Sequence, residues 1–494
     1  MQAAPQPYLT KLPNEILSDI AECVKEISLR EEGDYNPLKT KLSRFNFEAD
    51  VKARQATTAL DQCCLVSKRF HDIFRPFLFS YVNVSCCVSG SGGSTKFVSA
   101  LELIQGLRRL LEHRPEIGLW IREIRFSIDD EVDDLLMGHT SVHPDFVAML
   151  SKMPALTAFK FDGYMVGASW GALHPSIRDA LREVCQLDTI QELRAATRII
   201  PMDVLMSSPA LRNLQLFATS TAFEEDDSLE DAPLNPSEEN SASAADVSLR
   251  VGRLPGIQSL VCTDSERLES HLPHLCAKYS PAFQDLRSLL LVSNIPTSPL
   301  VLDLVQKFLR LTGSNLQELQ IQIEYGFSFI RPLDLTPLTQ LRRIKLRSKR
   351  EGGVYANDPP KSDDETFVQM LVQTLKTLEG ALHIEEIDIW VVWEHYQDSH
   401  NAEDGHGRHP DILRRLDSSL GCFADRARYP SLQSVVIRML CVCMNLSGEP
   451  WEEVDEPGDL PRKDLLPTLH SDDRFRLDVF NEVEVDEWDE FDLA

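Results

Sequence analysis

The sequence lacks the marks of a secreted or membrane-spanning protein. Its opening residues, MQAAPQPYLTKLP, contain no basic start followed by an apolar core, and no stretch reaches the roughly 18 uninterrupted apolar residues of a membrane span. The 11 cysteines are odd in number and scattered, which is typical of reduced thiols and not of a disulfide framework. We therefore expect a soluble protein that is cytoplasmic, nuclear or both, with no membrane partner.

Fingerprints of catalysis are also missing. The chain contains no G-x-S-x-G, H-E-x-x-H, P-loop or dinucleotide-binding pattern. The histidine-rich stretch HYQDSHNAEDGHGRHP (395–410) matches no closed zinc spacing and has no paired cysteines, so a polar loop is the simpler interpretation. We expect no enzymatic activity in this chain, no cofactor and no metal.

Basic charge is scarce, and the deficit is concentrated. The formal net charge is -27, but residues 224–246 hold nine acidic and no basic residues, and residues 449–494 hold 17 acidic against four basic. These two segments account for 22 of the 27 excess negative charges, so the rest of the chain is nearly neutral. We expect a disordered acidic loop at 220–248, a disordered acidic tail at 449–494, and no binding to nucleic acid.

The chain is rich in one apolar repeat. The pattern L-x-x-L-x-L, with aliphatic or aromatic replacements, recurs with helical stretches between the copies. Proline stands two residues before several copies, as in PAL at 154 and PSL at 430, which favours a helix stop followed by a strand. Copies begin at Ile121, Leu156, Ile190, Leu211, Ile257, Leu286, Leu316, Leu341, Ile384 and Leu432. This pattern predicts an α/β fold over 86–448, an irregular leucine-rich-repeat solenoid of strand-helix units.

Two amphipathic segments precede the repeats. LPNEILSDIAECV (12–24) places Ile16, Leu17 and Ile20 on one stripe at helical spacing, and LVSKRFHDIFRPFLF (65–79) has the same rhythm. Such short helices are marginal alone, so their apolar stripes need a partner. We expect a helical domain over 1–85, with a polar insertion at about 30–54.

These two segments resemble the F-box, a short helical module. Together they cover about seventy of the 494 residues. The insertion between the halves is longer than is usual in that family. The residues that carry the resemblance are Leu12, Pro13, Glu15, Ile16 and Leu17 in the first segment, and Leu60, Cys64, Val66, Ser67, Lys68, Arg69 and Phe70 in the second.

The resemblance implies a fungal-type F-box protein with a leucine-rich-repeat domain. Such a protein is the substrate-recognition subunit of an SCF-type cullin-RING ubiquitin ligase: its F-box docks the Skp adaptor, which links it to the cullin, and the repeats hold a protein substrate. The adaptor-binding residues that the resemblance implies are Leu12, Pro13, Ile16, Leu17, Ile20, Leu65, Val66 and Phe70.

Two alternatives stay open at this point. The N-terminal helices can instead be a cap that covers the end of the solenoid, because terminal repeats are atypical and need capping. The whole chain can instead be a non-catalytic leucine-rich-repeat scaffold or regulatory protein that recruits no ligase.

Alternate residues of each repeat strand should face outward from the solenoid. In LRRIKLR these are Arg343, Lys345 and Arg347, and in IEEIDIW of the next copy they are Glu386, Asp388 and Trp390. A basic row beside an acidic and aromatic row is a candidate substrate-binding surface, because arginine and tryptophan dominate binding hot spots. The alternative is a solvated face whose charges partly neutralise each other.

Overall fold

The computed structural model of the chain divides into two compact units, one that ends at Ile190 and one that begins at Gln191. No described helix combines the length and apolar composition needed to cross a membrane. The residues that the structure describes are 14, 16–18, 20, 64–65, 67–84, 87–89, 96–128, 135–137, 140–163, 170–171, 173–196, 200–217, 254–263, 275–293, 299–323, 332–348, 371–396, 414, 417–418, 420–444, 467 and 471–483. The predicted insertion at 30–54 and the predicted acidic loop at 220–248 lie outside them.

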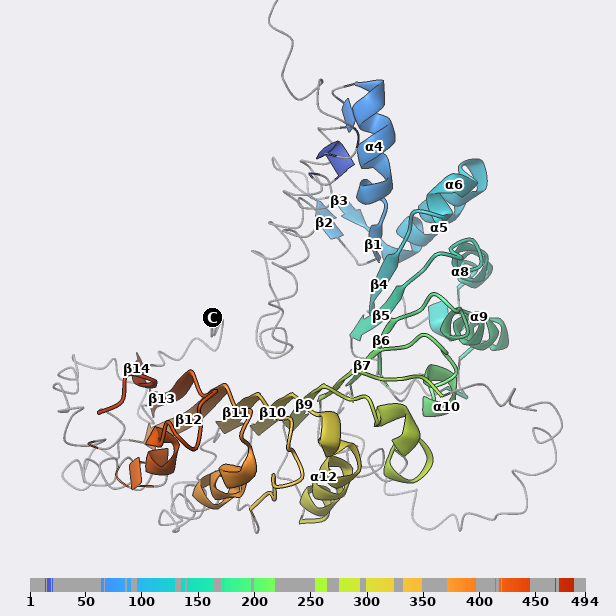
Figure 1. Cartoon of the computed structure of the whole chain (residues 1–494). Helices are drawn as coiled ribbons and strands as arrows, with labels where there is room; N and C mark the ends of the chain where they lie inside the picture. Colours follow the sequence, from blue (N-terminus) through green and yellow to red (C-terminus); the bar gives the residue numbers. More distant parts are fainter. Residues whose placement is uncertain are drawn as a thin grey trace, which may run out of the picture. The chain divides into compact units, whose positions relative to one another are not determined.

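The first unit begins with a small helical cluster around α4 (Lys68–Leu78) (Figure 1). The hydroxyl of Ser67 accepts a hydrogen bond from the Phe70 amide at 3.2 Å and so caps the start of this helix. Phe70 and Phe74 lie one turn apart and stack with ring centroids 5.5 Å apart. Leu17 and Cys64 complete the buried core of the cluster, so the two F-box-like segments contact each other.

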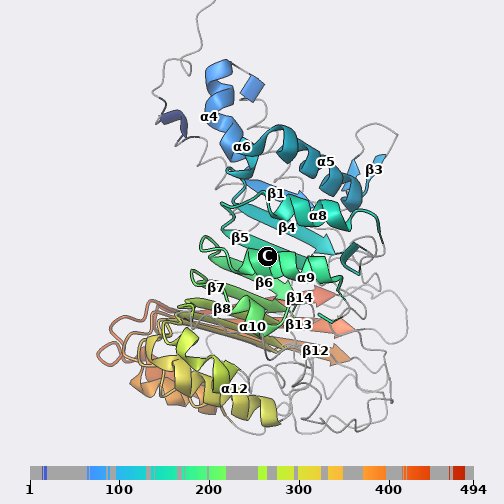
Figure 2. The same cartoon turned by 90° about the vertical axis from the view of Figure 1, so that its right-hand side faces the viewer.

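The rest of the first unit contains three strands of a parallel sheet. Helices cover one of its faces, and a separate antiparallel pair of short strands lies nearby in sequence (Figure 2). The three parallel strands are β1 (Tyr81–Val84), β4 (Glu123–Ile128) and β5 (Ala158–Gly163). The antiparallel pair is β2 (Cys87–Ser89) and β3 (Lys96–Val98). The helices are α5 (Ala100–His113), α6 (Pro115–Gly118), α8 (His143–Leu150) and α9 (Pro175–Cys185).

The second unit is a longer parallel sheet whose strands follow one another in chain order. Short helical segments connect the strands on one face of this sheet (Figure 1). The strands are β6 (Glu192–Ala196), β7 (Asn213–Phe217), β8 (Ser259–Thr263), β9 (Ser288–Ser293), β10 (Glu318–Ile323), β11 (Arg343–Ser348), β12 (Glu386–Tyr396), β13 (Ser434–Met444) and β14 (Phe475–Val483). The helical segments are α10 (Met202–Leu205), η3 (Ser280–Phe283), α12 (Pro299–Thr312), η4 (Gly313–Asn315), η5 (Thr377–Gly380) and η7 (Gly421–Ala424).

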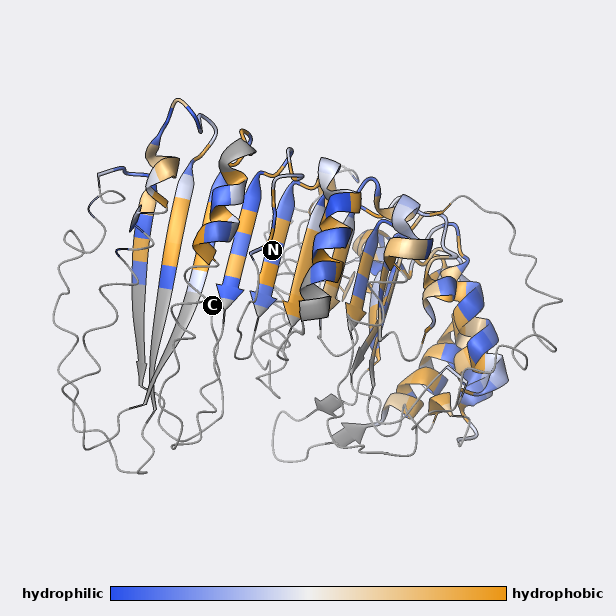
Figure 3. Cartoon of the chain, turned by 90° about the horizontal axis from the view of Figure 1, so that it is seen from below, coloured by the Kyte–Doolittle hydropathy of each residue, from blue (hydrophilic) through white to orange (hydrophobic). Residues whose placement is uncertain are grey.

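Strand register places equivalent repeat positions side by side. Leu319 of β10 pairs with Leu289 of β9 on one side and Ile344 of β11 on the other, and all three are buried. The alternation of apolar and polar residues along these strands is visible in Figure 3. Every predicted L-x-x-L-x-L copy coincides with a strand, and the prediction of a mixed α/β fold with parallel strands is confirmed. The arrangement is compatible with a solenoid-like repeat fold.

The prediction of a wholly disordered tail over 449–494 is wrong for β14. This strand pairs in parallel with β13, with Val435 opposite Phe475. Arg474 anchors its start, because the guanidinium donates to the Asp472 carboxylate at 2.6 Å and to the Phe423 carbonyl at 3.1 Å. Hydrogen bonding from Arg474 is the main reason that the pKa of Asp472 lies well below its usual range.

Gly118 and Gly106 form a matched pair for testing how the first unit packs. A methyl group at Gly118 would overlap the carbonyl oxygen of Lys152, whereas at Gly106, inside α5, it would meet nothing. We expect Gly118→Ala to lower the free energy of unfolding by at least about 2 kcal/mol. Gly106→Ala should raise it by about 0.5–1 kcal/mol through helix propensity. Urea unfolding of both variants measures this, and equal stabilities would contradict the packing of Gly118 against Lys152.

Two buried cysteines should resist thiol reagents. Burial raises the pKa of Cys185, on α9, and of Cys262, on β8, to about 12. At pH 8 both should therefore remain protonated, and only the thiolate reacts. We expect iodoacetamide to leave Cys185 and Cys262 unlabelled in the native protein and to label them after denaturation, while half-buried Cys422 reacts faster. Peptide mass spectrometry measures the labelling; rapid native labelling of Cys262 would place it outside the core.

Candidate protein-interaction sites

The N-terminal cluster sorts the predicted adaptor-binding residues into two groups. Leu17 and Phe70 are buried in the chain's own core, at 1% and 3% exposure, and Ile20 packs against them. Ile16 and Leu65 are instead exposed, at 43% and 80%. The remaining predicted residues, Leu12, Pro13 and Val66, lie outside the described part of the chain.

A polar contact also joins the two halves of this cluster. The guanidinium of Arg69 donates a hydrogen bond to the side-chain oxygen of Asn14 at 2.7 Å, across 55 positions of sequence. Leu17 and Phe70 therefore hold the halves together, while Ile16 and Leu65 present apolar surface. These two side chains are the exposed apolar groups that the cluster offers within the described part of the chain.

The predicted substrate-binding residues lie on two adjacent strands of the second unit. Register places Arg343 opposite Glu386, Lys345 opposite Asp388, and Arg347 opposite Trp390. Their side chains alternate with Ile344, Ile387 and Ile389, which are buried, and with half-buried Leu346, so they belong to the sheet face opposite the core. We call this face of β10–β14 the open face.

Trp390 is held between two guanidinium groups. Arg347 on β11 lies over the indole ring at 5.0 Å from its centroid, and Arg438 on β13 lies at 4.6 Å. Register explains this stack, since Trp390 pairs with Arg347 on one side and Arg438 on the other. The sequence reasoning did not select Arg438, although it occupies the equivalent position of the next repeat copy.

The sequence predicted that Asp388 faces outward, but its carboxylate is buried. The residue is only 2% exposed, and Arg438 binds its Oδ2 at 2.8 Å. Burial raises the pKa of Asp388, and the positive charges of Arg438 and Lys345 oppose that rise. Arg438 also lies 3.9 Å from the carboxylate of Asp478 on β14, so it bridges three strands.

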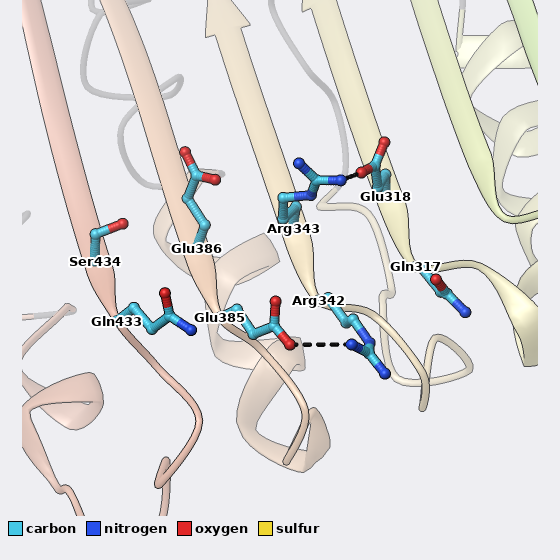
Figure 4. Close-up of a pocket in the computed structure, with 8 residues that line it drawn as sticks. All are labelled: Gln317, Glu318, Arg342, Arg343, Glu385, Glu386, Gln433 and Ser434. Carbon is cyan, nitrogen blue, oxygen red and sulfur yellow. Dashed lines mark hydrogen bonds and ion pairs between the residues drawn. The ribbon is translucent and has the colours of Figure 1, made fainter. Parts of the chain in front are cut away.

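A polar pocket of about 350 Å³ lies where β10–β13 begin (Figure 4). Its lining comes from the two consecutive variable positions of L-x-x-L in four successive repeats: Gln317, Glu318, Arg342, Arg343, Glu385, Glu386, Gln433 and Ser434. Backbone hydrogen bonds join these positions of neighbouring repeats. The Arg342 N–H donates to the Gln317 carbonyl at 2.8 Å, and the Glu385 N–H donates to the Arg342 carbonyl at 2.7 Å.

Ion pairs inside the pocket engage both arginines. Arg342 binds Glu385 at 3.2 Å, and Arg343 pairs with Glu318 on β10 and not with Glu386, its register partner on β12 (Figure 4). The sequence pattern placed the basic row of β11 beside the acidic row of β12, as the register has it, but it did not single out Glu318. Glu318 could have been recognised from the sequence, because it occupies the same position as Arg343 in the preceding repeat copy.

The side chains of these sites define what they can contact. The open face and its pocket offer carboxylates, guanidinium groups, an ammonium and an indole, which suit charged and polar protein segments. Within the described part of the chain, no group of three or more His, Cys, Asp or Glu residues is placed to hold a metal ion. Most of the histidine-rich stretch 395–410 lies outside it.

Comparisons with known proteins add little to this picture. No protein-family model matches the chain. No curated protein matches it either. Among solved structures, it is similar to a Bacteroides fragilis protein from a structural genomics consortium, with 12% identity, 81% of this chain and 89% of that chain covered, and a TM-score of 0.32.

The Arg438–Asp388 pair should respond asymmetrically to substitution. Arg438→Met leaves a buried carboxylate without its ion-pair partner, so we expect a loss of about 3 kcal/mol in unfolding free energy at pH 7. Asp388→Asn should leave the unfolding free energy at pH 7 equal or higher, because the buried charge is removed while Arg438 keeps Asp478 and Trp390 as partners. The double variant should recover most of the loss. Equal losses in both single variants would contradict this account.

The same pair gives a pH dependence with a defined sign. The pKa of Asp388 is raised in the folded protein, so its ionisation opposes folding. Wild-type stability relative to Asp388→Asn should therefore fall as pH rises from about 4 through the raised pKa, and the two should converge at acidic pH. Urea unfolding of both proteins between pH 4 and pH 7 measures the difference.

Proposed function

We propose that this protein is the substrate-recognition subunit of an SCF-type cullin-RING ubiquitin ligase. The observation that carries the proposal is the packing of the two F-box-like segments into one helical cluster, in which Leu17 contacts Phe70 and Phe74 across the sequence insertion. An F-box with an insertion must close in this way to present one docking surface. The exposed Ile16 and Leu65 are the side chains that would enter the adaptor.

The ligase function requires no catalytic residue in this chain. The adaptor and cullin would bring a charged ubiquitin-conjugating enzyme close to a substrate held on the repeats. Tethering raises the effective concentration of substrate lysines near that enzyme, which accelerates transfer without new chemistry. The open face of the second unit supports this role, because it combines charged groups with Trp390.

Adaptor binding tests the proposal directly. We expect the double variant Ile16→Glu, Leu65→Glu to lose adaptor affinity by about thirtyfold or more, because a charge would be buried at each contact. Both residues are exposed, so the melting temperature should stay unchanged. A pulldown with purified Skp adaptor measures binding, and Leu382→Glu, at an exposed leucine of the second unit, is the matched control.

Two outcomes would contradict the proposal. If the wild-type chain recovers no adaptor, the docking role fails. If the double variant recovers as much adaptor as Leu382→Glu, the cluster is not the docking site. Co-purification of a cullin separates the ligase subunit from a scaffold, because a scaffold that recruits no ligase brings down no cullin.

A further inference from the structure

Charge is polarised along the strands of the open face. The row at the start of the strands carries two carboxylates, Glu318 and Glu386, against one guanidinium, Arg343. The next two rows carry four cations against two carboxylates. Those rows contain Lys345, Arg347, Arg438 and Arg476 as cations, and Asp388 and Asp478 as carboxylates. The sign of the excess charge therefore reverses within two residues.

Internal ion pairs leave specific groups for a partner. Arg343 pairs with Glu318, Arg438 with Asp388, and Arg476 with Asp478. Among the residues that the structure describes, neither Glu386 nor Lys345 belongs to an ion pair, and Lys345 is exposed. One anion and one cation of the open face are thus available to an incoming segment.

The pocket gives Glu386 a suitable setting for a basic side chain. Ser434, the first residue of β13, lines the same pocket in register with Glu386 and adds a hydroxyl to it (Figure 4). A guanidinium or ammonium group needs several acceptors, and the Glu386 carboxylate and the Ser434 hydroxyl supply them. The pocket volume of about 350 Å³ accommodates such a side chain.

The spacing of the two groups fits an extended chain. Glu386 and Lys345 lie on neighbouring strands, two residues apart in register. Strand spacing and residue rise place their Cα atoms roughly 8 Å apart. Side chains at positions i and i+2 of an extended segment point to one side and lie about 7 Å apart, so one segment can reach both groups.

We propose that the open face binds an extended protein segment that carries a basic and an acidic side chain two positions apart. The basic side chain enters the pocket at Glu386, and the acidic side chain meets Lys345 and the guanidinium of Arg347 stacked on Trp390. This inference deepens the proposed function, on which it rests for its biological meaning, by naming the kind of segment that a substrate presents.

Selection of a phage-displayed library of random 12-residue peptides on the immobilised full-length chain tests this. We expect doublets of opposite charge at i and i+2 to be enriched by about fivefold or more over the input library. Glu386→Lys should abolish that enrichment and favour acidic doublets instead. Glu183→Lys makes the same charge change at an exposed site on α9 and should select like the wild type.

The outcomes separate the inference from the proposed function. Absence of opposite-charge enrichment, or identical enrichment with Glu386→Lys, overturns the binding mode. The same immobilised preparations are then probed with purified adaptor, whose capture should not depend on Glu386. Adaptor capture without charge selection removes only the inference, whereas charge selection without adaptor capture removes only the ligase role.

Discussion

The parallel pairing of repeat strands in exact register is the constraint on which the second unit depends. Each pairing places leucine or isoleucine beside its equivalent in the neighbouring copy, so the core continues from strand to strand. The same pairing aligns the variable positions into columns on the opposite face. Packing and recognition are therefore coupled, because a strand that slipped by one residue would exchange its buried and exposed side chains.

Much of this architecture follows from the sequence alone. The period-two alternation identified ten of the strands, because apolar residues that pack on one face leave a strong signal. β14 was missed because its alternation is embedded in acidic sequence that is typical of disorder. The pairing of Arg343 with Glu318 and the burial of Asp388 were also missed. Each depends on side chains of the strands on both sides, whereas the sequence comparison considered only the strand pair β11 and β12.

The N-terminal cluster illustrates a related limit. Helical spacing placed Ile16, Leu17, Leu65 and Phe70 on amphipathic segments, yet it could not show which of them are buried and which are exposed. That division depends on how two segments separated by a long insertion rotate against each other. Leu17 and Phe70 turn inward, and Ile16 and Leu65 remain in solvent.

The position of β14 has a consequence for how the protein behaves at high concentration. It is the last strand in the sheet order among those that the structure describes, and a terminal strand is a template onto which a strand of another molecule can add. β14 carries Arg476 and Asp478, and the sequence that follows is strongly acidic. Pairing of two molecules through their β14 edges would bring these acidic sequences together, and repulsion between like charges opposes that pairing.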